Sequence, residues 1–116
     1  MENRIEILNL EEGFPTGEEA VGKLASGLKS AKSRGVVFVK LIHGWGSSGK
    51  GGGIKRAVKR IMPELGKQGL LREWIEGKDW GVTQELYLKW YAKHPELKMD
   101  QDLNRNNLGI TMVKIR

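Results

Sequence analysis

The sequence contains no cysteine and no long apolar run, and each absence excludes a class of protein. Without cysteine there is no disulfide scaffold, no thiolate zinc site and no thiol nucleophile. No apolar stretch approaches the roughly 18–20 residues needed to cross a bilayer. The first residues, Met-Glu-Asn-Arg-Ile-Glu, lack the basic start and apolar stretch of a signal peptide. We therefore expect a cytoplasmic protein that makes no contact with membranes.

The length and the charge of the chain narrow the possibilities further. The chain has 116 residues, which suits one domain, because domains cluster at roughly 100–150 residues. Lysine and arginine number 20 against 14 aspartate and glutamate residues, which gives a formal charge of +6. A basic balance of this kind favours polyanions as partners. We expect a single domain over residues 1–116.

Apolar patterning predicts four strands and three helices. Four short apolar segments predict strands, at residues 5–10, 36–42, 70–76 and 110–115. The second segment is nearly continuous, as expected for a strand that is buried on both faces of a sheet.

The segments between these strands have apolar residues at helical spacing and are predicted to be helices. A capping box starts the first helix at Thr16. The second helix follows an apolar stripe over residues 54–65, and Pro63 is expected to end its regular part near Met62, with one further turn after it. The third helix occupies residues 83–95.

The order of these elements predicts the fold class. It is β-α-β-α-β-(inserted α)-β, in which the first two βα units favour parallel neighbours through right-handed crossovers. The last two strands are expected to pair antiparallel. We predict a two-layer α/β sandwich with a small mixed four-stranded sheet, and a loop-helix insertion at about residues 77–107.

Glycine is concentrated in one loop between the second strand and the second helix. Of the 16 glycines, six lie between Gly44 and Gly53. A glycine loop between a strand and a helix offers free amides at a helix N-terminus, which is the usual setting for anion capture. We predict a phosphate-binding site there, formed by a set of glycines and neighbouring basic residues: Gly44, Gly46, Gly49, Lys50, Lys55 and Arg56.

Three other interpretations of this loop remain open. It can be a connector without a ligand. Its G-x-G-x-x-G spacing also occurs in dinucleotide sites, although the chain is short for that fold. Its G-x-x-x-x-G-K spacing occurs in P-loops, but Gly51 stands where a P-loop needs serine or threonine to hold magnesium.

The loop and its surroundings resemble the Smr (small MutS-related) domain family. The resemblance is carried by Ile-His-Gly-Trp-Gly at residues 42–46, by Ile-Lys-Arg-Ala-Val at residues 54–58, and by the closing strand at residues 108–113. It implies the predicted fold, binding of DNA or RNA, and DNA-nicking or RNA endonuclease activity. It carries over His43, Gly44, Gly46, Gly49 and Lys50 as site residues.

Two candidate catalytic residues follow from this resemblance. His43 can bond a phosphate or act as general acid or base, or it can simply fix the loop by bonding to backbone. The first strand of the family usually ends in Leu-Asp-Leu-His, and residues 8–11 here are Leu-Asn-Leu-Glu. We expect cleavage to be impaired because Asn9 cannot act as a base. Glu11, or Glu12 beside it, can supply substitute chemistry, and the acidity usual in turns explains both residues equally well; Glu11 is the second candidate.

Aromatic residues suggest further contacts. Trp45 lies in the glycine loop and is predicted to stack on a base. The aromatic residues of the insertion are expected to pack on the sheet edge, with base stacking as the alternative; they are Trp80, Tyr87, Trp90 and Tyr91. Two other functions stay open, a protein-interaction module that uses the insertion and a small phosphate- or nucleotide-binding protein.

Metal sites receive no support from the sequence. Asp100, Asp102 and Asn104 follow the spacing of a calcium loop, but Arg105 and Thr111 stand where glycine and glutamate are required. No metal site and no cofactor are predicted, and a need for a divalent metal in cleavage is left open.

Overall fold

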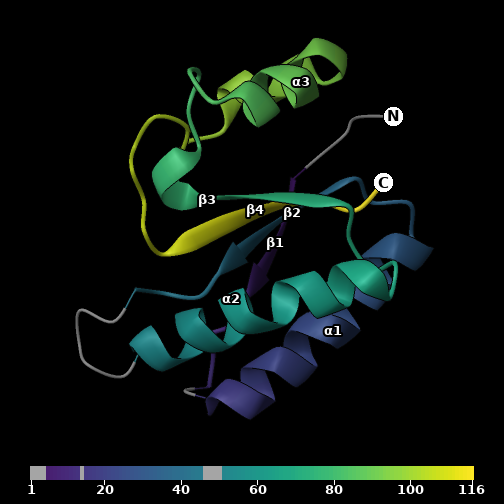
Figure 1. The fold of residues 1–116 in the computed structure, drawn as a ribbon, viewed down its shortest axis with the longest axis vertical. Helices are drawn as coiled ribbons and strands as arrows, with labels where there is room; N and C mark the ends of the chain where they lie inside the picture. The colour runs from purple at the N-terminus through teal and green to yellow at the C-terminus, as the bar shows by residue number, and fades with distance from the viewer. Residues whose placement is uncertain (1–4, 14, 46–50) are drawn as a thin grey trace.

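Strands and helices alternate along the chain in the predicted order (Figure 1). The computed structural model describes residues 5–13, 15–45 and 51–116. Within these residues the strands are β1 (Ile5–Asn9), β2 (Phe38–Ile42), β3 (Glu73–Glu76) and β4 (Ile110–Lys114). The helices are α1 (Gly17–Ser33), α2 (Gly51–Lys67) and α3 (Glu85–Lys93). Two short 3-10 helices, Gly77–Asp79 and Pro95–Met99, flank α3.

The four strands form one mixed sheet, as the sequence predicted, and their order in it is β1-β2-β4-β3. β1 and β2 are parallel, with Asn9 opposite Ile42. β4 is antiparallel to both of its neighbours, with Ile110 opposite Ile42 and Thr111 opposite Glu76. The carboxyl ends of β1, β2 and β3 therefore lie at the same end of the sheet, where β4 begins.

Helices α1 and α2 cover one face of the sheet and form the predicted two-layer core (Figure 1). The capping box is present, since the Thr16 side chain accepts from the Glu19 amide and the Glu19 carboxylate accepts from the Thr16 amide. Helix α2 continues through Pro63 to Lys67. Leu65 lies beyond the proline and is 2% exposed, so its burial holds the last turn against the sheet.

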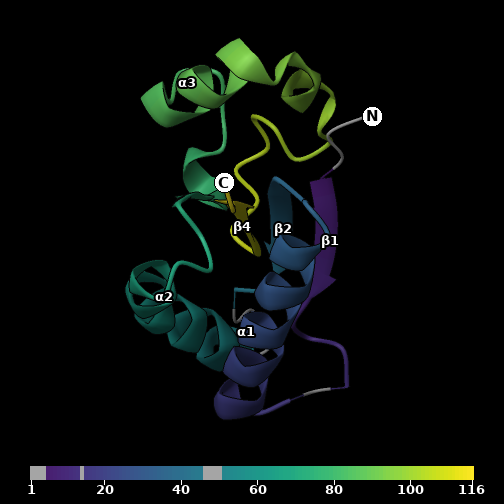
Figure 2. The same ribbon diagram turned by 90° about the vertical axis from the view of Figure 1, so that its right-hand side faces the viewer.

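The insertion covers the opposite face of the sheet and adds a third layer (Figure 2). Its aromatic residues pack on the face, and not at the edge as expected. Phe38 of β2 lies with its ring centroid 5.3 Å from that of Trp90, and Trp80 lies 5.2 Å from Tyr87. Burial of β2 on both faces, predicted from its continuous apolar run, is thereby explained.

A buried ion cluster joins the insertion to the centre of the sheet. Lys40 of β2 is 3% exposed, and its ammonium lies 2.8 Å from the carboxylate of Asp100 and also pairs with Asp102. The indole nitrogen of Trp80 donates to Asp100 at 2.9 Å, and the amide of Asn107 donates to Asp102 at 2.9 Å. The acidic residues with calcium-loop spacing thus serve as partners of a lysine.

Within the described residues, none of the helices combines the length and apolar character that crossing a membrane requires.

Candidate functional site

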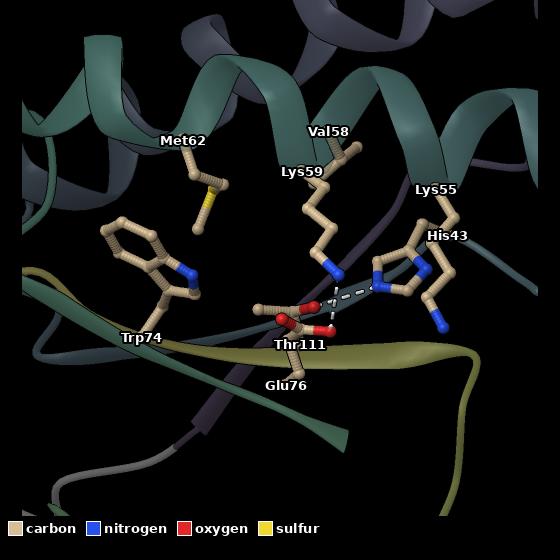
Figure 3. Close-up of a pocket in the computed structure, with 8 residues that line it drawn as sticks. All are labelled: His43, Lys55, Val58, Lys59, Met62, Trp74, Glu76 and Thr111. Atoms are coloured by element: carbon tan, nitrogen blue, oxygen red, sulfur yellow. Dashed lines mark hydrogen bonds and ion pairs between the residues drawn. The ribbon is translucent and has the colours of Figure 1, made fainter. Parts of the chain in front are cut away.

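Charged and polar side chains from every strand meet at one end of the sheet. Glu11 follows β1, His43 follows β2, Glu76 ends β3, and Thr111 lies near the start of β4. The first turns of α2 bring Lys55 to the same place, where it lines a pocket with His43 (Figure 3). In α/β folds the carboxyl ends of parallel strands are the usual location of ligand sites. This end of the sheet is therefore the candidate site.

His43 is buried at this end, with 1% of its surface exposed. Its Nδ1 donates to the carbonyl oxygen of Gly44 at 2.7 Å, and its Nε2 accepts from the hydroxyl of Thr111 at 2.9 Å. This tautomer is assigned from the partners, because a carbonyl oxygen can only accept. In this arrangement both ring nitrogens are occupied, and the imidazole connects the end of β2 to β4.

The surroundings of His43 favour its neutral form. Burial lowers the pKa of His43 below its ordinary value, and the charge of Lys55 lowers it further. The carbonyl of Gly44 and the charges of Glu11 and Glu76 act in the opposite direction but do not outweigh burial. A neutral, enclosed imidazole is suited to holding the loop in place.

Glu11 lies directly against the start of the glycine loop. Gly44 has a φ of +70°, and a Cβ at this position would lie 2.1 Å from a carboxylate oxygen of Glu11. The backbone conformation favours glycine at position 44, and a larger residue there would also displace the Glu11 carboxylate. The structure thus brings together Glu11 and His43, the two candidate catalytic residues, at the ends of two neighbouring parallel strands.

The pocket between α2 and the sheet is small (Figure 3). It leaves about 10 Å³ for the centre of a water molecule, which is room for roughly one water. Its wall contains an ion pair between Lys59 and Glu76, 3.4 Å apart. A cavity of this size cannot enclose a nucleotide, so any nucleotide would have to bind on the surface around it.

Helix α2 presents a basic surface that begins at this pocket, which Lys55 and Lys59 line, and continues outside it. Its apolar side faces the core, and its other side carries four cations, Lys55, Arg56, Lys59 and Arg60. Arg56, Lys59 and Arg60 are exposed, and Lys55 is half-buried. Lys59 pairs with Glu76, whereas no ion pair is found within the described residues for the other three. These three cations, here called the basic face of α2, have charge available for a partner.

Trp45 is exposed, with 55% of its surface open to solvent. In contrast, three aromatic residues of the insertion are 2% exposed or less, and they are Trp80, Tyr87 and Trp90. These three cannot stack on bases in this arrangement, which leaves the half-buried Tyr91. The remaining predicted loop residues, Gly46, Gly49 and Lys50, lie outside the described residues.

Some residues at the site gave no signal in the sequence. Thr111 bonds His43 across a separation of 68 residues, so only the pairing of β4 with β2 reveals it. Glu76 likewise reaches the site only because β3 pairs with β4, which places it opposite Thr111. In the part of the chain that the structure describes, no cluster of three or more potential ligands could hold a metal ion.

Comparisons with models of known protein families, with curated proteins and with solved structures gave no match.

Proposed function

We propose that this protein is a cytoplasmic nucleic-acid-binding domain that holds the phosphate backbone of DNA or RNA on the basic face of α2. The observation that carries the proposal is a group of three cations within six residues of α2, Lys55, Arg56 and Arg60, with no ion pair found for them among the described residues. Phosphate contacts of this kind supply most of the affinity of nucleic-acid-binding proteins.

Two further features support the proposal. The net charge of +6 gives the whole chain an attraction for polyanions. Lys55 of the basic face also lies at the end of the sheet where two residues carried over by the resemblance, His43 and Gly44, meet Glu11, which stands where the family has histidine.

Strand cleavage is a secondary part of the proposal. In the described arrangement Glu11 is half-buried and has a carboxylate at the start of the loop, whereas His43 is enclosed behind it. Any cleavage is therefore expected to depend on Glu11 as the general base, with His43 fixing the loop beside it. Cleavage that persists in Glu11→Gln would contradict this assignment.

Binding is tested by fluorescence anisotropy with labelled 20-nucleotide DNA and RNA, each as single strand and duplex, at several salt concentrations. The double variant Lys55→Glu/Arg56→Glu should bind more weakly and reduce the slope of log affinity against log salt by about 1.4–1.8, for two lost phosphate contacts. A matched control with the same change of charge is Lys93→Glu/Lys98→Glu, on the exposed surface of the insertion. An unchanged slope in the first variant, or equal losses in both, would contradict the proposed surface.

The insertion supports a second function less well. Its aromatic stripe is internal, so a protein partner would have to use its exposed apolar residues, of which Leu88 is 49% and Met99 is 77% exposed. Deleting residues 78–106 is not a usable test, because it would uncover Phe38 and Met112, both 0% exposed. Leu88→Ala and Met99→Ala leave the fold intact and test this surface directly.

A further inference from the structure

We propose that Trp45 is a stacking platform for an unpaired base, which makes single-stranded nucleic acid, or a strand with an unpaired segment, the substrate class. This inference rests on the proposed function and deepens it, because the basic face of α2 alone does not distinguish single strands from duplexes.

The exposure of Trp45 is the first observation that supports it. Of the four tryptophans, Trp80 and Trp90 are each 1% exposed. Trp74 is half-buried and packs against the core between the sheet and helices α1 and α2. Trp45 is 55% exposed, whereas the other large aromatic side chains among the described residues lie in the two hydrophobic clusters or against them. A large apolar ring held at the surface is characteristic of a contact site.

The indole of Trp45 rests on a fixed piece of backbone. Its Cδ1 lies 3.6 Å from where a Cβ on Gly109 would be, so the ring lies beside a residue that has no side chain. The carbonyl of Gly109 accepts from the amides of His43 and Gly44 at 2.9 and 3.1 Å. The amide of Gly109 donates to the side chain of Asn107 at 2.9 Å. A ring supported in this way loses little freedom when a base stacks on it.

The third observation is the position of Lys55, a cation of the basic face. Lys55 lines one pocket with His43, and His43 lies two residues before Trp45 along the chain, so a cation of the basic face lies at the strand end that leads to the exposed ring. Proteins that bind single strands combine a positive surface for the backbone with aromatic rings for the bases. Inside a duplex the faces of each base are covered by its neighbours, so away from the duplex ends a surface indole can stack only on a base that is unpaired.

The test compares a 12-nucleotide oligo(dT) single strand with a 12-base-pair duplex, using the full chain and anisotropy titrations. Trp45→Ala should bind the single strand roughly 5- to 150-fold more weakly, as loss of one stacked base does, and Trp45→Phe should fall between the two. Duplex affinity should be unchanged in both variants. Leu88→Ala is the matched control, since it removes an exposed apolar side chain from α3.

Intrinsic fluorescence gives a second measurement. Stacking on the exposed indole should quench part of the wild-type emission when oligo(dT) is added, and this quenching should be absent in Trp45→Phe. Circular dichroism should show that all three variants are folded. Single-strand affinity that does not change in Trp45→Ala, or falls equally for the duplex, would overturn the stacking site while leaving the proposed function in place. Failure of the wild-type protein to bind any oligonucleotide would overturn both.

Discussion

Replacing Lys40 with methionine keeps most of the side-chain volume between the sheet and the insertion. It removes the positive charge that pairs with Asp100 and Asp102. The side chains of Lys40, Asp100 and Asp102 are 4%, 8% and 17% exposed, so water cannot take over the role of the ammonium group. Removing one partner of a buried ion pair costs about 3–5 kcal/mol, because the remaining charge stays buried without compensation. We expect a loss of that size in the free energy of unfolding of Lys40→Met.

Thermal and urea denaturation followed by circular dichroism measure this loss. With an unfolding entropy of about 2.1 cal/mol/K per residue, a chain of 116 residues should lose roughly 12–20 °C in Tm. The triple variant Lys40→Met/Asp100→Asn/Asp102→Asn removes all three charges and keeps acceptors for Trp80. It should recover much of the lost stability, because the cost comes from the unpaired carboxylates.

The pH dependence gives an independent check on the same cluster. Burial raises the pKa of Asp102, but hydrogen bonds from Lys40 and Asn107 outweigh it and hold the pKa below its ordinary value of 3.8. In the wild-type protein this contribution to stability is present above pH 3.8 and is lost as the pH falls below it. Without Lys40 the effect of burial dominates, so the buried carboxylates of the folded variant bind protons more readily than those of the unfolded chain. The difference in stability between Lys40→Met and the wild type should therefore shrink as the pH falls from 7 to 4.

Two results would refute this account of the cluster. A loss of less than about 1 kcal/mol in Lys40→Met would mean that the carboxylates are solvated after all. A triple variant as unstable as Lys40→Met would mean that the lysine acts through packing of its methylene groups and not through its charge.

Two remaining predictions concern glycines and the histidine at the site. Gly77→Ala should destabilise the protein by about 3 kcal/mol or more, because the new Cβ would lie 1.8 Å from a backbone oxygen. Gly22→Ala, on the open side of α1, should instead stabilise the protein by about 0.5–1 kcal/mol. Chemical denaturation measures both changes, and equal effects of the two variants would contradict the geometry. Because the pKa of His43 lies below 6.5, the unfolded chain binds the proton more readily and stability should fall as the pH drops below 6.5. In NMR titrations Glu11→Gln should lower this pKa further and Lys55→Met should raise it, and shifts in the same direction would show that these charges do not act on the ring.

The order of elements could be predicted from the sequence because each one carries its own local pattern. The capping box at Thr16 and the continuous apolar run of β2 are readable without knowledge of the rest of the chain. The position of the insertion is different. Whether its aromatic residues pack on an edge or on a face of the sheet depends on which strand they meet. The sequence feature that points to the face is Lys40, because a charge within an apolar strand needs a partner from another part of the chain.

The candidate site was only partly predictable for a similar reason. Parallel pairing of β1 with β2 could be expected from the βα order, and it places Glu11 next to Gly44. The enclosure of His43 could not be expected, since it depends on Thr111 and on the register between β2 and β4. Motif residues can be located from the sequence, but whether they face solvent depends on strands far away along the chain.

The central position of β4 has a consequence for synthesis of the protein. β4 is the last strand in the sequence, yet β3 is joined to β2 only through it in the described sheet. His43 and Thr111 are separated by 68 residues, which a ribosome adds in roughly 3–14 s at about 5–20 residues per second. During that time β2 has one edge without its partner, and edges of this kind invite pairing with other chains. Chaperone contact with the nascent chain should therefore concentrate on β2 until β4 has emerged.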